Sequence, residues 1–205
     1  AFDVFEGSEG PVQDLRNAVV FARAEDQSVQ RVGMSRVWRA LDQCGEAWVM
    51  RRKRSETDWI RGEPALDPNG AIMACVTSTG HAVVPDIASG RAIKQWRAHD
   101  SACQAAVFDP SGTRLFTCGV DGQLKTWRVL DWSQEDCAPL TTYRATEAYA
   151  LAVSAVKNVL AVGGEHGVVK LRHMESGKES FADVGPEHVV SRLQFSPSGD
   201  PLVAP

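Results

Sequence analysis

The chain has 205 residues, of which 43% are apolar and 23% are charged, and its formal net charge is −4. These values are typical of a globular protein, and the small negative charge does not indicate a large surface for a polyanion such as nucleic acid. The sequence contains no run of about 18 apolar residues, so no membrane-spanning helix is predicted.

The cysteines form an odd set without a Cys-x-x-Cys pair: Cys44, Cys75, Cys103, Cys118 and Cys137. Several of them fall inside predicted strands, where free cysteine packs as a small apolar side chain. The N-terminus also lacks the pattern of a secretory signal, so we expect a reducing intracellular location, cytoplasmic or nuclear. Because the cysteines and histidines are scattered and no nucleotide motif is present, no metal site and no cofactor are predicted.

Residues 1–56 are predicted to form an irregular first unit with an insertion that disturbs its period. The unit contains the most concentrated charge of the chain, the basic cluster Arg51, Arg52, Lys53 and Arg54. Such a cluster is able to contact nucleic acid or an acidic partner. The other interpretation is a solvated outer strand whose positive edge discourages pairing with another sheet. No aromatic side chains are interleaved with the cluster to stack on bases, which favours the solvated strand.

The next three units are each predicted to contain four short strands. In the second unit, 57–98, the strands are 59–66, 71–76, 81–86 and 91–96. The third unit, 99–143, has strands at 104–108, 113–118 and 123–129, and then an insertion at 130–139 before its fourth strand. In the fourth unit, 144–184, the strands are 150–153, 159–162, 168–172 and 178–182. Residues 185–205 begin a further unit, which stops within its second strand.

Two kinds of turn recur along these units in one register. Pro-x-Gly turns place glycines at positions 70, 112 and 199, which are 42 and then 87 residues apart. A second set of turns places glycines at positions 80, 122 and 167, which are 42 and then 45 residues apart. Proline presets one turn dihedral and glycine accepts a positive φ, so both residues have a physical reason to recur. A period of about 40–45 residues indicates a propeller built from repeated four-stranded antiparallel sheets.

The segment 98–128 carries the clearest copy of this pattern. His99 lies eleven residues before Pro110, which belongs to the turn between two predicted strands. Thr117 follows in the next strand, an Asp-Gly turn begins at Asp121, and Trp127 closes the copy. This order and spacing resemble the repeat of the WD-repeat (WD40) β-propeller family.

The resemblance implies an all-β fold of four-stranded antiparallel blades. It further implies a buried, hydrogen-bonded tetrad with a structural role, formed by His99, Thr117, Asp121 and Trp127. Ala98 and Arg128 replace the family's usual glycine and aspartate, which leaves the tetrad positions intact. In the neighbouring units the tetrad is lost, because other residues stand at its aspartate and tryptophan positions: Thr79 and Pro85, and His166 and Arg172.

The sequence is expected to hold about four to five blades, whereas a closed ring of this family has roughly six to eight. Closure removes exposed sheet edges, and an open stack would leave an apolar blade face in water. We therefore expect that the sequence is part of a longer chain, or that another segment or subunit completes the ring.

A repeat array of this kind predicts a non-catalytic scaffold that docks other proteins within a multi-subunit assembly. The resemblance implies that partners meet the loops between blades and the loops between the second and third strands of a blade. Here those loops hold Ser78, Thr79, Arg97, Asp100, Ser101, Val120 and Glu165. Trp132 is a further candidate anchor, because an aromatic side chain in a polar insertion has little core to enter.

An enzyme is not predicted, and no residue is assigned a catalytic role. His99 beside Asp100 has the composition of an acid–base pair, but the hydrogen bonds of the repeat would bury the histidine. A ligand site in the central channel would need convergent polar groups, whereas the predicted inner strands 104–108 and 150–153 are rich in alanine and valine. A propeller that associates with nucleic acid through residues 51–54 is the alternative function.

Overall fold

The computed structural model describes residues 60–87, 92–139 and 148–183, together with 185, 189–196, 199, 202 and 203. These residues form three four-stranded sheets and one two-stranded sheet, and each strand pairs antiparallel with its neighbour. We call the four-stranded sheets blades 1, 2 and 3, in chain order. The predicted all-β fold of four-stranded antiparallel blades is confirmed.

Every blade is a meander in which consecutive strands are neighbours. Blade 1 consists of β1 (Ile60–Leu66), β2 (Met73–Thr77), β3 (His81–Pro85) and β4 (Ala92–Arg97). Blade 2 consists of β5 (Cys103–Phe108), β6 (Arg114–Gly119), β7 (Gln123–Arg128) and β8 (Gln134–Pro139). Blade 3 consists of β9 (Ala148–Ser154), β10 (Val159–Gly164), β11 (Val168–His173) and β12 (Glu179–Asp183), with a 3-10 turn at Glu165–Gly167. The two-stranded sheet pairs β13 (Gln194–Phe195) with β14 (Leu202–Val203).

The predicted insertion at 130–139 is wrong, because half of it is a strand. β8 pairs with β7, with Leu124 opposite Ala138 and Lys125 opposite Cys137, and only the turn 129–133 separates the two strands. β8 is the edge strand of its blade, and its residues 134–137 are exposed. An edge strand of this kind has little apolar alternation, and the sequence Gln-Glu-Asp therefore resembles a loop.

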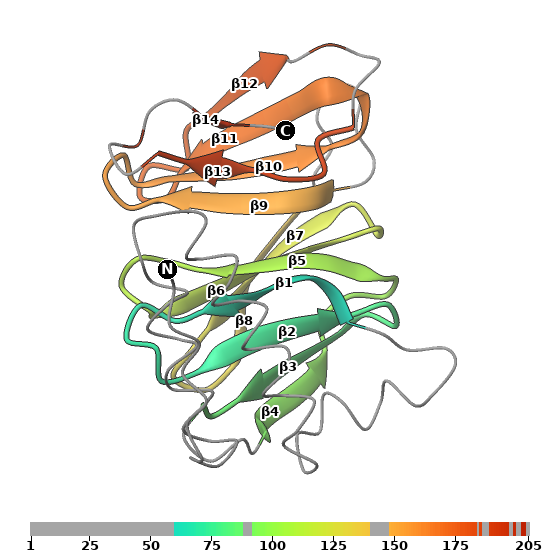
Figure 1. Ribbon diagram of the computed structural model, residues 1–205, viewed down its shortest axis with the longest axis vertical. Helices are drawn as coiled ribbons and strands as arrows, with labels where there is room; N and C mark the ends of the chain where they lie inside the picture. Colours follow the sequence, from blue (N-terminus) through green and yellow to red (C-terminus); the bar gives the residue numbers. More distant parts are fainter. Residues whose placement is uncertain are drawn as a thin grey trace, which may run out of the picture.

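The blades are stacked along one direction, with their first strands β1, β5 and β9 adjacent to one another (Figure 1). The fourth strands β4, β8 and β12 are the opposite edges of the three sheets. The two-stranded sheet lies beside β9. Its strand β13 contacts β9 and so continues the series of first strands β1, β5 and β9. This arrangement gives each pair of neighbouring blades one face-to-face junction.

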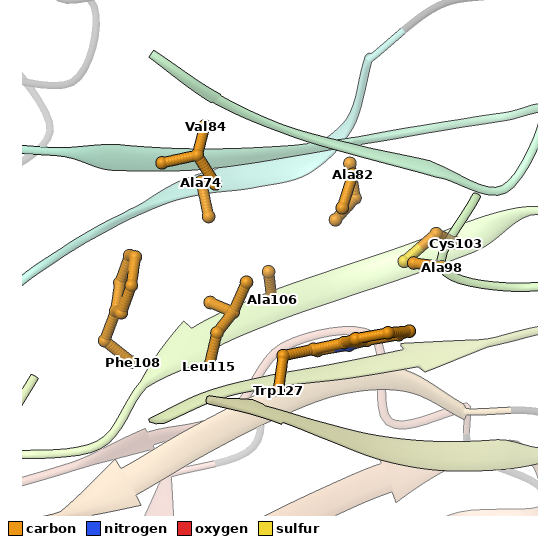
Figure 2. Close-up of a cluster of buried hydrophobic side chains, with 10 residues drawn as sticks. Ala74, Ala82, Val84, Ala98, Cys103, Ala106, Phe108, Leu115 and Trp127 are labelled. Carbon is orange, nitrogen blue, oxygen red and sulfur yellow. The ribbon is translucent and has the colours of Figure 1, made fainter. Parts of the chain in front are cut away.

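An apolar cluster fills the junction between blades 1 and 2 (Figure 2). Small side chains of β2 and β3 point across the gap toward larger side chains of β5, β6 and β7. The buried members are Ala74, Val76, Ala82, Val84, Ala98, Cys103, Ala106, Phe108, Leu115 and Trp127. Burial of each larger apolar side chain contributes about 1.5–3 kcal/mol, so this junction is a major source of stability.

The second strand of blade 2 supplies side chains to both of its junctions. Leu115 belongs to the cluster shared with blade 1, whereas Phe116 and Cys118 belong to a cluster shared with blade 3. The alternation follows from the strand itself, because successive side chains point to opposite faces of a sheet. The cluster toward blade 3 also contains Leu124, Ala148, Leu160 and Val162.

An aspartate holds the turn between the first two strands in both blade 1 and blade 2. The Asp67 carboxylate accepts hydrogen bonds from the backbone N–H groups of Ala71 (2.6 Å) and Ile72 (2.8 Å). In the same way, Asp109 accepts from the N–H of Arg114 at 2.9 Å. Both aspartates are buried, and these bonds satisfy backbone donors of the two turns. The equivalent contacts, 42 residues apart, show the sequence period in three dimensions.

Candidate functional site

A chain of four hydrogen-bonded side chains crosses the core of blade 2. His99 Nδ1 lies 2.8 Å from Asp121 Oδ1, and His99 Nε2 lies 2.8 Å from Thr117 Oγ1. The indole N–H of Trp127 donates to Thr117 Oγ1 at 2.9 Å. The structure thus brings together the four residues that the resemblance placed in a tetrad. They join the segment before β5 to β6 and β7 and to the turn between those two strands.

The neutral form of His99 fits these contacts. If Nδ1 carries the hydrogen, it donates to the Asp121 carboxylate, and Nε2 then accepts from the Thr117 hydroxyl. Burial lowers the pKa of His99 from its ordinary value, and the hydrogen bond and negative charge of Asp121 oppose that effect. The ring is only 1% exposed, so it has no access to a substrate. The arrangement therefore suits the fixing of loops and does not suit acid–base catalysis.

Two further residues hold His99 and its segment in place, and neither was predicted. A Cβ atom added at Gly119 would lie 2.8 Å from His99 Nδ1 and 3.0 Å from the Ala102 carbonyl oxygen, so only glycine fits there. Lys125 Nζ donates to the Ala98 carbonyl oxygen at 2.8 Å. Both contacts join residues far apart in the sequence, and no local pattern distinguishes these positions.

The loop 97–102, between blades 1 and 2, is fastened to the turns of both blades. Ala98 and His99 donate their backbone N–H groups to the Gly80 carbonyl at 2.8 and 2.9 Å. Gly80 has φ of 83°, a conformation that favours glycine, which explains one of the recurring glycine positions. On the other side, the N–H of Val120 donates to the Ala102 carbonyl at 2.9 Å. One connected rim, formed by residues 78–80, 97–102 and 119–122, results from these bonds.

Most of the predicted partner-binding residues lie on this rim: Ser78, Thr79, Arg97, Asp100, Ser101 and Val120. Arg97, Asp100 and Ser101 are the exposed members of the set. The guanidinium of Arg97 donates to the carbonyl oxygens of His99 (3.3 Å) and Asp100 (2.8 Å), so its charge is presented at a fixed place. Glu165 lies apart, in the 3-10 turn of blade 3.

Blade 1 has a different polar cluster at the position of the lost tetrad. Thr79 Oγ1 lies 3.2 Å from Thr77 Oγ1 and 3.0 Å from His81 Nδ1. The backbone N–H of His81 also donates to Thr77 Oγ1 at 3.2 Å. These short-range contacts stabilise a single turn, whereas the blade 2 tetrad connects the inter-blade loop with three other segments.

The reason given for a binding role of Trp132 is wrong, because the side chain does enter a core. Its ring centroid lies 5.5 Å from that of Trp96, and Trp96 in turn meets Trp127 at 5.3 Å. Trp132 is half-buried against the cluster between blades 1 and 2. The indole nitrogen of Trp96 is buried and has no hydrogen-bond partner among the described residues, a cost that the two ring contacts offset.

The basic cluster 51–54, predicted from the sequence, lies outside the residues that the structure describes. Within them, no three histidine, cysteine or acidic side chains are grouped as ligands of a metal ion. Among the same residues, no helix has the length and apolar character needed to cross a membrane.

Comparison with known families adds the decisive observation. Residues 90–128, which contain the four hydrogen-bonded side chains of blade 2, match the model of the family described as "WD domain, G-beta repeat". Residues 90–128 are a WD repeat. The matched segment runs from β4 through β7 and includes the loop 97–102.

The similarity to two curated proteins extends beyond that segment. Autophagy-related protein 18f of Arabidopsis thaliana is 28% identical over 148 residues, which are 66% of this chain and 19% of that protein. The WD repeat-containing protein 91 homolog of Dictyostelium discoideum is 23% identical over 128 residues, 58% of this chain and 17% of that protein. The chain thus spans less than a fifth of the length of these curated relatives.

Proposed function

We propose that this WD-repeat protein is a non-catalytic scaffold that docks partner proteins, within a multi-subunit assembly, on the rim of residues 78–80, 97–102 and 119–122. The observation that carries the proposal is the contrast between the two layers of this rim. Beneath it, His99 and its hydrogen-bonded partners are buried and fixed. Above it, Arg97, Asp100 and Ser101 are exposed.

A fixed loop is well suited to recognition, because less conformational freedom is lost when a partner binds. The backbone of 97–102 is held by bonds to Gly80 and Ala102, and the N–H of Asp100 donates to Asp121 Oδ2 at 3.2 Å. The Asp100 side chain lies 3.8 Å from the Arg97 guanidinium and is 88% exposed. The rim therefore offers one cation and one anion at defined places, a pattern that favours a polar protein surface as the partner.

The proposal is tested by charge reversal at two exposed acidic positions. Asp100→Arg changes the rim, whereas the matched control Glu175→Arg changes the turn between β11 and β12, at the other end of its blade. Each variant of the full chain is captured from a native extract under identical conditions, and the bound proteins are quantified by mass spectrometry. We expect Asp100→Arg to lose partners that Glu175→Arg retains, while both variants keep the wild-type unfolding midpoint.

Equal recovery of every partner by the two variants would remove the rim as the docking site. A catalytic role would instead require a reaction that depends on rim residues. The contact between His99 and Asp121 beneath the rim is buried, so it is not available for such a reaction.

A further inference from the structure

The two junctions of blade 2 differ in their outer parts. Toward blade 1, the space near the outer strands is filled by the rings of Trp96, Trp127 and Trp132. Toward blade 3, the third strand β11 presents charged side chains instead. Arg172 of β11 contacts Asp136 of β8 across the junction, with its Nη2 atom 3.2 Å from Asp136 Oδ2. Lys170 lies two residues earlier on the same face of the strand.

Lys170 is a cation withdrawn from water at this junction. Its side chain is only 8% exposed, and its ammonium lies 2.8 Å from Glu179 Oε1 on the neighbouring strand β12. That ion pair lies within blade 3, so it neutralises the cation without attaching blade 3 to blade 2. Arg172–Asp136 is an ion pair between these two blades, and both of its side chains are partly exposed.

The two junctions therefore depend on different forces. Aromatic rings in contact gain dispersion energy and remove apolar area from water, and both effects persist at high ionic strength. A partly exposed ion pair gains little and is screened by salt, while a buried ion pair recovers its desolvation cost only in good geometry. Apolar packing toward blade 3 is contributed by β6 and β7 of blade 2 and by β10 of blade 3, which supply Phe116, Leu124 and Leu160.

We propose that the junction between blades 2 and 3 is a built-in opening point of the fold. Blade 3 separates from blade 2, while the junction between blades 1 and 2 stays closed. Raised ionic strength promotes the opening, because it weakens the Arg172–Asp136 contact. This inference is independent of where partner proteins dock.

The chain contains its own reporters for the two junctions. Cys103 is buried in the cluster toward blade 1, and Cys118 is buried in the cluster toward blade 3; both are fully shielded. The Cys118 thiol lies 3.8 Å from the Ala148 carbonyl oxygen of blade 3, so it is released when the blades separate. A buried thiol reacts with an alkylating reagent only after such an opening.

The experiment measures iodoacetamide labelling of the native full chain over time, resolved by peptide mass spectrometry at Cys103 and Cys118. Between about 0.05 M and about 1 M NaCl, we expect the Cys118 rate to rise roughly three- to fivefold, the size of one screened ion pair. We expect the Cys103 rate to change less than about twofold over the same range. Equal rates at both cysteines in every condition would show global unfolding alone and would overturn the proposal, as would faster labelling of Cys103.

Two neighbouring variants separate the junction from the blade. Asp136→Asn removes the contact between blades and should raise the Cys118 rate roughly three- to fivefold at low salt. Glu135→Gln makes the same chemical change one residue earlier, but Glu135 pairs with Arg114 and Arg128 of its own blade, so the ratio of the two cysteine rates should not change. The double variant Asp136→Leu with Arg172→Met gives the junction an apolar outer part and should slow Cys118 labelling. An unchanged Cys118 rate in the Asp136 variants contradicts the proposal.

Discussion

Gly119 lies against the imidazole ring of His99 and leaves no room for a methyl group, because an added Cβ would be 2.8 Å from Nδ1 and 2.9 Å from Cγ. We expect Gly119→Ala to displace the ring and to lower the free energy of unfolding by about 1–3 kcal/mol. The measurement is the urea unfolding midpoint at pH 7.5. Gly177→Asn is the control, since Gly177 has open space around it and its φ of 67° is one that asparagine tolerates. A wild-type midpoint for Gly119→Ala would show that the ring is not held as tightly as the structure describes.

His99 makes the stability depend on pH in a definite direction. Burial lowers the pKa of the folded-state ring below its ordinary value of 6.5, so between the two pKa values the unfolded chain binds a proton that the folded chain does not. The contribution of His99 to the free energy of unfolding is therefore complete above pH 6.5 and is lost as the pH falls below that value. The free energy of unfolding then changes by at most about 1.4 kcal/mol per pH unit.

Urea titrations between pH 7.5 and pH 5 measure this slope, and nitrogen NMR of the ring should show a neutral imidazole with hydrogen on Nδ1. Replacing His99 by glutamine should reduce the slope. A ring that becomes protonated at pH 6.5 in the folded protein would exclude the lowered pKa.

Trp132 adopts φ of 59°, which is unfavourable for a tryptophan, and the contact with Trp96 compensates for that strain. Trp132→Asn relieves the backbone but removes the ring, so we expect a net loss of about 1–2 kcal/mol, less than for a fully buried tryptophan. Thermal unfolding followed by circular dichroism provides the measurement. Leu130→Asn, in the same turn and 89% exposed, should change stability by less than about 0.5 kcal/mol. If the two variants melted alike, the packing of Trp132 would contribute nothing.

Asp109 fixes the turn between β5 and β6 through several hydrogen bonds at once. Its carboxylate accepts from the Arg114 N–H (2.9 Å), the Ser111 hydroxyl (2.5 Å) and the Thr113 hydroxyl (3.2 Å). Asp109→Ala should remove the partner of the Arg114 N–H and of both hydroxyls, and it should cost about 1–3 kcal/mol in urea unfolding. Asp131→Ala removes a similar but exposed set of contacts to Ser133, and a smaller shift is expected. Shifts of equal size would mean that burial of the turn is unimportant.

The sequence predicted the strands of blade 2 from β5 to β7 within one residue of their ends. That success depended on local chemistry, because the Pro-Ser-Gly and Asp-Gly turns mark both strand ends. The same approach missed β8, whose residues Gln134, Glu135 and Asp136 have the composition of a solvated loop. An edge strand is specified by its pairing with β7 and by ion pairs such as Glu135 with Arg128 at 3.0 Å, which are not visible in a local window.

The fixed rim was only partly predictable for a related reason. His99, Thr117, Asp121 and Trp127 were found because their spacing resembles a known repeat. Gly119 and Lys125 hold the same segment through contacts that are distant in the sequence. Gly119 lies close to Ala102 and His99, 17 and 20 positions away, and Lys125 contacts Ala98, 27 positions away. Trp132 was assigned to a surface role because its contact with Trp96 crosses between two blades. Contacts of this kind depend on the assembled fold and leave no periodic pattern.

The side chains of β6 alternate between the two junctions of blade 2, and this limits where residues can be inserted or deleted. Leu115 serves one junction, and Phe116 and Cys118 serve the other. A single residue inserted or deleted within the strand would exchange the two sets and place each against the wrong neighbour. Differences in length between relatives are therefore expected in exposed turns, such as 175–178, where an added residue alters no junction.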